Sequence, residues 1–495
     1  MKMKLVGSAV AMAVLMAGCT KAPETSPINY DLVINQGRVI DPETNTDKVM
    51  NIGIKDGVIE TLTNDSLSGE RVIDADGMIV GPGFIDLHTH SGFPFGALLQ
   101  LRDGATTALE LEAGAYPASE YGNFLRNAPY VNFGASVSHA LIRVGVIEGE
   151  TKGWFIDEAG TLVPEEGYEQ LATSEEIEQM RKIIVEELEA GGLGIGFLLD
   201  YMSPAVSEEE LRMIFEVAAE HDAVVWAHIR RGVNGDIQPL LDVLDVAVET
   251  GAPLHICHIN ANAMGAIGEW MKVIDEANAN GADITMEIFP YTAGSTFISA
   301  DVFDRDWKTI FDISYEDVQW AETGEYFTEE TWYKMRKERP DGMIIHHYMQ
   351  EDWLREAMVH PDMMIATDAM PAINANLKSA PNGAGSYTRV LAQYVRDEGV
   401  ISLNDAFYKG SYLPAKRLEG VAPIFGKKGR VQEGAHADLL IFDIDNINSA
   451  ASYTDPFVEA TGYSYVMIEG EIVLENDELT LNAPGRNLLG TTPAE

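Results

Sequence analysis

Hydrophobic and polar residues alternate at both ends of the chain, whereas the middle alternates between short apolar runs and longer amphipathic stretches. In residues 30–42 the alternation is interrupted by Asn35-Gln36-Gly37, which predicts short strands and a tight turn. The next alternating segment contains Asp56-Gly57, a hairpin signal. Similar patterns return at residues 437–443 and 465–473. The pattern at the two ends of the chain therefore predicts an antiparallel sheet.

The middle of the chain has the pattern of repeated strand–helix units. Residues 174–188 and 207–220 have helical patterns, and each begins with a serine followed by acidic residues, as expected of a capped helix N-terminus. Alternation of strands with such helices predicts a parallel sheet. We expect eight strands, ending near His90, Glu112, His139, Asp200, His228, His258, Phe289 and Asp368. Residues 295–342, rich in Trp, Tyr and Asp, interrupt the pattern between the last two strands.

Metal-ligating residue types gather at these strand ends. His88 and His90 follow an apolar run and share one face of a strand, because side chains alternate along it. His228, His258 and Asp368 each end another short apolar segment. A single histidine there is more often a core residue, but four histidines and an aspartate are hard to explain by packing alone. Imidazole and carboxylate ligands suit zinc and similar divalent ions, so the pattern predicts a metal site.

The same residues resemble a known family. The order His-x-His, His, His, Asp is similar to that of the amidohydrolase superfamily. Further runs look like those of its D-aminoacylase branch, the N-acyl-D-amino-acid deacylases, including the N-acyl-D-glutamate deacylases. The similarity extends from Tyr30 to about Ile472, and its most specific motif is the one at residues 290–296; the runs that carry it are residues 138–143, 192–201, 290–296 and 367–371.

The resemblance implies an architecture and a set of domain boundaries. Amidohydrolases hold their metal centre in a (β/α)8 barrel, and both chain ends pair in a small β-sandwich. We accordingly expect a β-sandwich from residues 28–80 and 420–485, and a barrel domain from residues 81–419. The interruption at residues 295–342 would be an insertion over the mouth of the barrel, acting either as a lid or as aromatic packing against the rim.

One metal ligand of the family is missing. D-aminoacylases use a cysteine at the end of the second strand, where this chain has Ala113, and the carboxylated lysine of other amidohydrolases is also absent. Glu110 and Glu112 share one face of this apolar strand, where a carboxylate is costly without a cation or partner. We expect Glu112, with Glu110 as the alternative, to replace the cysteine. In the other interpretation both carboxylates only hydrogen-bond to histidines.

The resemblance also implies a division of roles in amide hydrolysis by metal-activated water. His228, His258 and Glu112 would hold the tighter ion, Zn²⁺ or a similar divalent ion, and His88, His90 and Asp368 could hold a second. Asp368 would also take a proton from water and return it to the leaving amine. Tyr291 would hydrogen-bond to the reacting carbonyl. His139 would support the ligands or have a plain structural role.

The basic positions that fit a substrate carboxylate in the family are not kept here, so either the carboxylate is bound differently or the substrate is not a free amino-acid derivative. Family members often carry a lysine two residues after the sixth-strand histidine and a Pro-Arg pair after the eighth strand. This chain has Asn260 and Pro381-Asn382 in these places. We expect Arg230 or Arg389 to bind a substrate carboxylate, with Asn260 at the lysine position. The alternative is that the arginines near the rim only form surface ion pairs.

Composition excludes some classes of function. The chain has 495 residues, which fits a barrel plus a smaller module, and 46% of them are hydrophobic. Its formal net charge of −44 argues against binding to nucleic acids or to anionic membrane surfaces, which need clustered Lys and Arg. A small-molecule substrate is the partner expected from these features.

The N-terminus has the features of an export signal. Lys2 and Lys4 precede an apolar run up to Gly18, and small residues before Cys19 resemble a bacterial lipobox. We expect a signal peptide at residues 1–18, a lipidated Cys19, a linker at residues 19–27 and a location in the periplasm or cell envelope; ordinary secretion is the alternative. Cys257 would then be the only free thiol of the mature chain.

Together these features predict an exported, metal-dependent hydrolase of linear amides, with N-acyl-D-amino acids as substrates. A cyclic amidase resembling dihydroorotase or hydantoinase is the enzymatic alternative. A surface lipoprotein with a stabilising metal is the non-enzymatic one, which Asp368 beside an open coordination position disfavours.

Overall fold

Eight parallel strands form a barrel at the centre of the molecule. In the computed structural model, which describes residues 29–490 except 123–124, 126–128, 150–152 and 155–165, these strands form one sheet in the order β16-β12-β11-β10-β9-β8-β7-β6. The last pairing, between the segments that follow β6 and β16, is a bridge from Thr89 to Ala369 with a 2.7 Å hydrogen bond from the His90 amide to the Ala369 carbonyl. The strands are β6 (Phe84–Asp86), β7 (Ala105–Ala115), β8 (Asn132–Ser138), β9 (Ile195–Leu198), β10 (Val225–His228), β11 (Leu254–Ile256), β12 (Ile284–Ile288) and β16 (Met363–Ile365).

These strands form because their sequences are nearly continuous apolar runs. Every residue of β7, β8, β9 and β10 is buried, as expected of a parallel sheet that is covered by helices on its outer face. The (β/α)8 prediction is confirmed, and the eight predicted strand ends lie near the ends of these eight strands.

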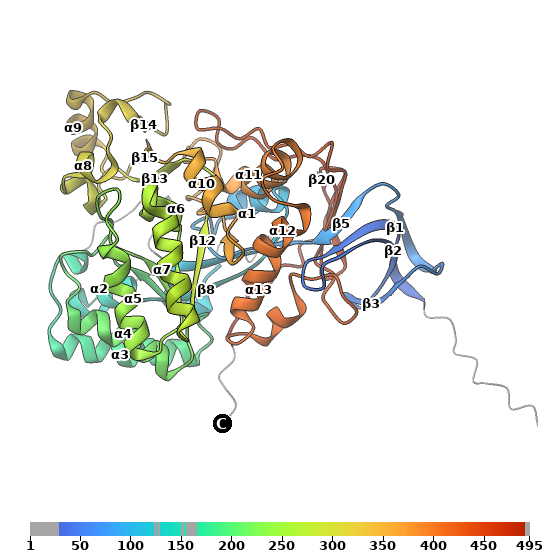
Figure 1. The fold of residues 1–495 in the computed structure, drawn as a ribbon, viewed down its shortest axis with the longest axis horizontal. Helices are drawn as coiled ribbons and strands as arrows, with labels where there is room; N and C mark the ends of the chain where they lie inside the picture. The colour runs from blue at the N-terminus through green and yellow to red at the C-terminus, as the bar shows by residue number, and fades with distance from the viewer. Residues whose placement is uncertain (1–28, 123–124, 126–128, 150–152, 155–165, 491–495) are drawn as a thin grey trace, which may run out of the picture.

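Helices surround the barrel (Figure 1). The hydroxyl of Ser207 caps α4 as predicted, but α3 is capped one residue before the predicted serine, by Thr173. There Thr173 and Glu176 form a reciprocal capping box, which satisfies two backbone amides. The helices outside the insertion are α1 (Pro94–Arg102), α2 (His139–Glu148), α3 (Ser174–Glu189), α4 (Glu208–Glu220), α5 (Gln238–Thr250), α6 (Ile259–Ala263), α7 (Ile267–Ala279), α10 (Glu351–Met358), α11 (Asn382–Arg389), α12 (Leu403–Phe407) and α13 (Leu413–Leu418).

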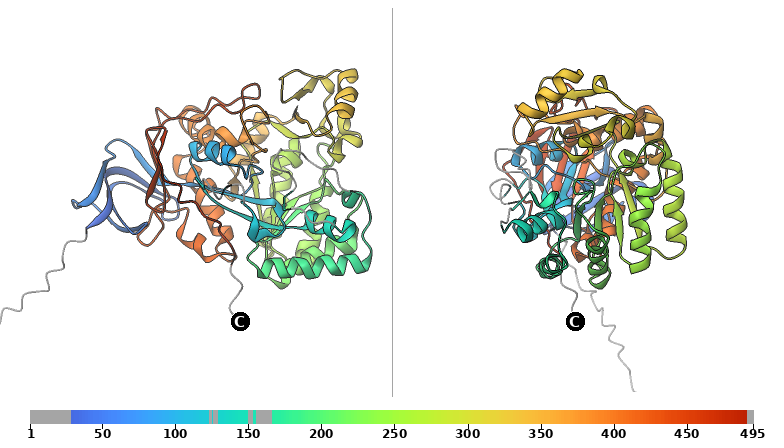
Figure 2. Two further views of the ribbon diagram at one scale, coloured as in Figure 1. Left: turned by 180° about the vertical axis from the view of Figure 1, so that it is seen from behind. Right: turned by 90° about the vertical axis from the view of Figure 1, so that its left-hand side faces the viewer.

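Strands from both chain ends lie side by side in a second, mostly antiparallel sheet, which protrudes from one end of the molecule (Figures 1 and 2). Buried side chains on one face of this sheet meet in a hydrophobic cluster of their own, whereas those on the other face, such as Ile79, Leu440 and Val466, join the barrel core. The strands are β1 (Tyr30–Asp41), β2 (Thr46–Lys55), β3 (Val58–Thr63), β4 (Gly69–Asp74), β5 (Ile79–Pro82), β17 (Leu439–Phe442), β18 (Tyr463–Ile468), β19 (Glu471–Glu475) and β20 (Glu478–Leu479).

One of the two turns expected in this sheet is absent. Asp56 and Gly57 both have positive φ and connect β2 to β3, as the hairpin signal predicted. At Asn35-Gln36-Gly37, however, β1 continues through the predicted turn. The register against β2 shifts between Ile34 and Gly37, and Gln36 has φ 58°. Residues 35–37 therefore form a β-bulge, in which β1 has one more residue than the facing part of β2.

The segment between β12 and β16 forms a small unit of its own. Its sheet has the order β13-β15-β14, and its aromatic residues form a core around Phe303, Trp307 and Trp332, which also includes Phe289 and Tyr291 after β12. Most of the aromatic side chains therefore pack within the insertion, while residues 295–304 contribute to the cavity described below. The elements are β13 (Ala293–Phe297), α8 (Trp307–Phe311), β14 (Val318–Trp320), α9 (Glu329–Glu338) and β15 (Met343–His347).

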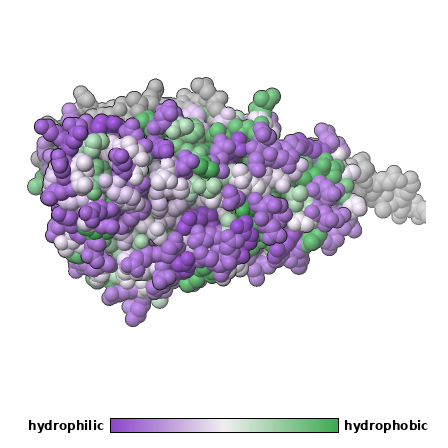
Figure 3. All heavy atoms as spheres, turned by 90° about the horizontal axis from the view of Figure 1, so that it is seen from above, coloured by the Kyte–Doolittle hydropathy of each residue, from purple (hydrophilic) through white to green (hydrophobic). Residues whose placement is uncertain are grey.

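The visible surface is mostly hydrophilic, with small separated hydrophobic patches (Figure 3), in agreement with the acidic composition. Within the described residues, we find no helix that is both long enough and apolar enough to span a membrane. The predicted signal peptide and the predicted lipidation site, Cys19, lie outside the described residues.

Candidate metal centre and its cavity

The two histidines of the His-x-His motif meet at the end of β6. Their Nε2 atoms are 3.2 Å apart, and both side chains are buried. Each ring is fixed from its other nitrogen by a buried carboxylate. Glu287 contacts His88 Nδ1 at 2.5 Å, and Glu110 contacts His90 Nδ1 at 3.0 Å. Both Nε2 atoms are therefore directed toward a common point.

A second pair of histidines lies opposite the first. His228 is the last residue of β10, and His258 follows β11 with φ 35°. A non-glycine residue with positive φ is uncommon and is one way in which sites hold strained backbone. His228 Nδ1 and His258 Nε2 are 3.0 Å apart, so this pair also directs two ring nitrogens at one point.

Glu112 lies between the two pairs. Its Oε1 is 2.7 Å from His258 Nε2 and 3.0 Å from His228 Nδ1, while its Oε2 is 3.3 Å from the Nε2 atoms of both His88 and His90. Each carboxylate oxygen thus faces one histidine pair. The close packing of the neighbouring strand requires a glycine, because a Cβ at Gly196 would lie 2.7 Å from the Glu112 carbonyl oxygen.

Asp368 completes the group from the segment after β16. Its Oδ1 is 3.4 Å from His88 Nε2 and 3.8 Å from His90 Nε2, and its backbone has φ 49°. Unlike the histidines, it is partly exposed, with 17% of its side chain accessible. Asp368 is therefore placed between the buried centre and the adjoining cavity.

The electrostatics of the group fit a bound cation. Burial alone would raise the pKa of Glu112, but the imidazoles of His88, His228 and His258 hold that pKa well below its ordinary value. Burial alone would lower the pKa of His88, but the carboxylates Glu112, Asp368 and Glu287 raise it well above its ordinary value. Carboxylates that favour positive charge here would equally favour a metal ion. Among the described residues, three fully buried groups could hold an ion: His88, His90 and Glu112; Glu112, His228 and His258; and His88, Cys257 and Glu287. A fourth group, His88, His258 and Asp368, includes the partly exposed Asp368.

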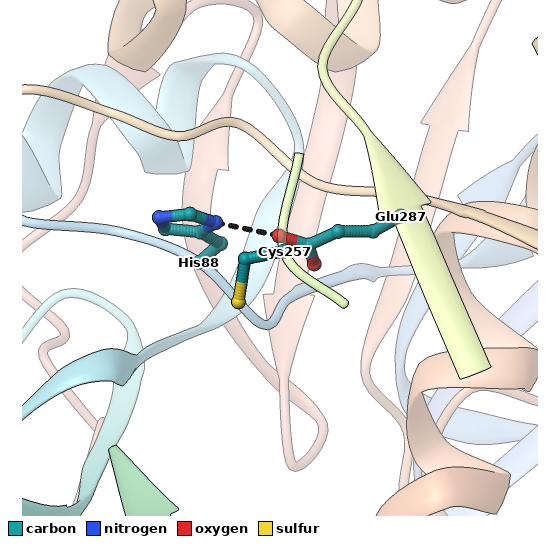
Figure 4. A group of neighbouring side chains, drawn as sticks. All are labelled: His88, Cys257 and Glu287. Carbon is teal, nitrogen blue, oxygen red and sulfur yellow. Dashed lines mark hydrogen bonds and ion pairs between the residues drawn. The ribbon is translucent and has the colours of Figure 1, made fainter. Parts of the chain in front are cut away.

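Glu287 is a feature that the sequence interpretation missed. It projects from β12 between His88 and His255, lies 3.2 Å from His255 Nε2, and has the buried Cys257 beside it (Figure 4). A carboxylate behind a ligating histidine fixes the ring and increases its basicity. The sequence pattern that could have identified Glu287 is a single glutamate in the apolar run 284–289. The same kind of pattern identified Glu112.

A cavity of about 190 Å³ opens beside the centre. His90, Glu112, His228, His258 and Asp368 line one side. Arg231, Tyr201 and His346 line it elsewhere, together with residues 294–297, 299–302 and Asp304. Tyr201 packs edge-on against the His228 ring, and its hydroxyl is 2.9 Å from the Thr296 hydroxyl. A buried reactive centre at one side of a cavity is the arrangement expected of an enzyme site.

The structure does not bring the predicted substrate residues into this cavity. Arg230 donates to Ser203 Oγ and to the carbonyls of Ser203 and Val206. Arg389, the last residue of α11, pairs with Glu351 and lies over the ring of Tyr291. Because both guanidinium groups are used by other parts of the fold, the structure gives no support to the prediction that Arg230 or Arg389 binds the substrate carboxylate, and it stays a prediction. Arg231, one residue further along, lines the cavity instead.

Three other predicted positions also lie outside the cavity lining. Tyr291 is buried, and its hydroxyl has no hydrogen-bond partner among the described residues. Asn260 donates to the Phe289 carbonyl at 3.2 Å. His139 contacts Glu210 at 2.9 Å, in a buried network with Arg143 that is separate from the metal-binding groups. These contacts give no support to direct roles of Tyr291 and Asn260 in substrate binding.

Comparisons with known proteins agree with the motifs. No family model matches the chain. The N-acyl-D-glutamate deacylase of Alcaligenes xylosoxydans xylosoxydans is 28% identical over 481 residues, which cover 89% of this chain and 93% of that protein. The D-aminoacylase of the same organism is 26% identical, covering 93% of this chain and 98% of that protein.

The fold has a close match among solved structures. The crystal structure of N-acyl-D-glutamate deacylase from Bordetella bronchiseptica gives a TM-score of 0.77 at 24% identity, covering 93% of this chain and 100% of that one. That structure contains zinc and a phosphonate inhibitor that mimics the tetrahedral intermediate of the reaction. Over most of its length, this chain is thus a relative of the D-aminoacylases and N-acyl-D-glutamate deacylases, and it has their amidohydrolase fold.

Proposed function

We propose that this protein is a metal-dependent amidohydrolase that cleaves the linear amide bond of N-acyl-D-amino acids. The observation that carries the proposal is the position of Glu112 between two histidine pairs, with Asp368 at the edge of a cavity. We infer the D configuration of the substrate and its acyl-amide bond from the names of the relatives, N-acyl-D-glutamate deacylase and D-aminoacylase.

The residues present fit one or two divalent ions such as Zn²⁺. Glu112 would be a ligand in place of the family's cysteine, with His228 and His258 on one side and His88 and His90 on the other. A divalent ion bound here would supply the Lewis acidity that activates water and polarises a carbonyl.

The chain's own groups would move the proton and bind the substrate. Asp368 is accessible from the cavity, so it can take a proton from the attacking water and deliver it to the leaving amine. Tyr201, unlike Tyr291, lines the cavity and packs against the ring of His228, so it can donate a hydrogen bond to the substrate carbonyl.

The experiment is a hydrolysis screen with metal-loaded protein, scored by amine release for the linear amides and by formation of the ring-opened N-carbamoyl acid for the cyclic amides. N-acetyl-D-amino acids, their L-isomers, dipeptides and the cyclic amides dihydroorotate and hydantoin would each be incubated with the protein. We expect amine release from N-acetyl-D-amino acids. Turnover of the cyclic amides alone would instead establish the cyclic-amidase alternative. No turnover of any compound would favour the non-catalytic metal-binding lipoprotein.

We also propose that the protein is exported and anchored to the cell envelope by a lipid on Cys19. The apolar run before Cys19 and the small residues next to it support this proposal. Mass spectrometry of the native N-terminus should find an acylated Cys19, and Cys19→Ala should release the protein from the membrane fraction. An unmodified N-terminus at another residue would contradict the anchor.

A further inference from the structure

Arg231 is the only lysine or arginine among the described residues that line the cavity. Its side chain is largely buried, with 11% exposed. Nη1 donates to the Ala261 carbonyl at 2.7 Å and to the Tyr348 hydroxyl at 3.0 Å, and the guanidinium lies near the rings of Phe311 and Tyr348. All of these partners are neutral, so they fix the position of the side chain without compensating its charge.

The nearest carboxylate is already used by another arginine. Asp200 lies 3.9 Å from Arg231 Nε, whereas it accepts a hydrogen bond from Arg305 at 2.8 Å. Within the described part of the chain, Nη2 of Arg231 has no hydrogen-bond partner. Burial of a charge is costly unless the charge is paired and hydrogen-bonded. The fold thus holds a desolvated guanidinium with a free donor edge at the cavity.

Three other arginines of this region have no such free guanidinium edge at the cavity. Arg230 donates to two backbone carbonyls, Arg389 pairs with Glu351, and Arg305 pairs with Asp200 and Asp301. Arg230 precedes Arg231 directly but is absent from the cavity lining, so the two arginines form a natural pair of test and control positions.

Arg231 is also close enough to the metal-binding residues to contact a group next to the reacting bond. Asp200 Oδ2 is 3.9 Å from Arg231 Nε and 3.9 Å from His228 Nε2, so the guanidinium lies within two such distances of a proposed metal ligand. In an N-acyl amino acid the α-carboxylate carbon is three covalent bonds from the reacting carbonyl carbon. An α-carboxylate can therefore reach the guanidinium while the reacting carbonyl lies beside the metal-binding residues.

We propose that Arg231 binds the α-carboxylate of the substrate and thereby selects N-acyl amino acids over neutral amides. This inference rests on the proposed function and names the group that recognises its substrate. The planar guanidinium can offer a carboxylate its free edge, and such charge-assisted hydrogen bonds are stronger than those between neutral groups. Arg231 would therefore replace the basic residues that the family carries at the positions of Asn260 and Asn382.

The test compares substrates that differ in one carboxylate, using metal-loaded protein. N-acetyl-D-leucine and N-acetyl-D-leucinamide differ in the α-carboxylate, whereas N-acetyl-D-isoglutamine carries only a side-chain carboxylate. For Arg231→Met we expect kcat/KM for N-acetyl-D-leucine to fall about 10- to 100-fold, mainly through KM. The values for the two α-amides should change less than about threefold, the size of a small packing effect. Arg230→Met is the matched control, and it should change kcat/KM for all three substrates by a similar factor.

The outcomes separate this inference from the proposed function. Equal losses on N-acetyl-D-leucine and its amide, or a loss confined to N-acetyl-D-isoglutamine, would overturn the α-carboxylate assignment while the amidohydrolase proposal stands. No turnover of any of the three by the wild-type protein would count against the proposed function itself. If Arg231→Met does not fold, inhibition of the wild-type protein decides: D-leucine must inhibit more strongly than D-leucinamide, and equal inhibition contradicts the assignment.

Discussion

Replacing Glu287 by glutamine would remove the negative charge behind His88 while keeping the size of the side chain. In the structure Glu287 contacts His88 Nδ1 at 2.5 Å and His255 Nε2 at 3.2 Å, and both Glu287 and His88 have 1% of their side chains exposed. A glutamine oxygen can still accept a hydrogen bond from His88, so the ring should keep its place. What is lost is the charge that increases the basicity of the ring.

The size of the effect follows from this geometry. A buried hydrogen bond to a charged group contributes about 1.5–3 kcal/mol. Carboxylates behind metal-ligating histidines contribute about 10- to 100-fold in metal affinity, which agrees with that range. We therefore expect Glu287→Gln to weaken metal binding about 10- to 100-fold. Burial alone would raise the pKa of Glu287, but His88 and His255 lower it to about 2. The charge, and with it the effect of the substitution, should therefore be present throughout pH 6–9.

Metal affinity would be measured by competition with a chelator, alongside thermal unfolding. Glu210→Gln is the matched control, because Glu210 is also a buried partner of a histidine, His139, but is absent from the metal-binding groups. It should lower stability and leave metal affinity unchanged. Equal metal affinity of Glu287→Gln and wild type would contradict a role of the Glu287 charge in metal binding, as would an equal loss of affinity in both variants.

Two further predictions concern the carboxylates of the centre. Asp368→Asn should lower turnover by about two to four orders of magnitude while the buried residues retain metal, as measured by kcat and metal content together; turnover like that of wild type would remove Asp368 from the reaction. Glu112→Ala should lower metal content and activity together, and Glu110→Ala should do so less, because the Glu110 carboxylate faces the far nitrogen of His90, the Trp154 indole and the Ala113 amide. The reverse order in metal analysis would make Glu110 the ligand.

The barrel and the ligand set could be predicted from the sequence for a common reason. Each proposed ligand comes at or close to the end of an apolar run, and parallel strands place these ends at one edge of the barrel. Glu112 was predicted because a carboxylate in an apolar strand needs a cation or a partner. Both signals depend on local sequence alone, and the structure brings the five strand ends together.

Substrate contacts could not be predicted in the same way. Arg230 and Arg231 are adjacent, and the conformation of the loop after β10 decides which of them lines the cavity. Arg389 is directed to Glu351 by the position of α11 against α10, which no local pattern shows. Glu287 carried the same signal as Glu112, but its role depends on which histidine the neighbouring strand places in front of it.

The most direct test of the account is removal and return of the metal. The purified protein would be stripped with a chelator, its metal content measured, and release of D-leucine from N-acetyl-D-leucine followed before and after Zn²⁺ is added. We predict that activity falls with metal content and returns when the metal is restored. Undiminished release of D-leucine by protein shown to contain no metal would contradict the assignment of Glu112 and the four histidines as a catalytic metal centre.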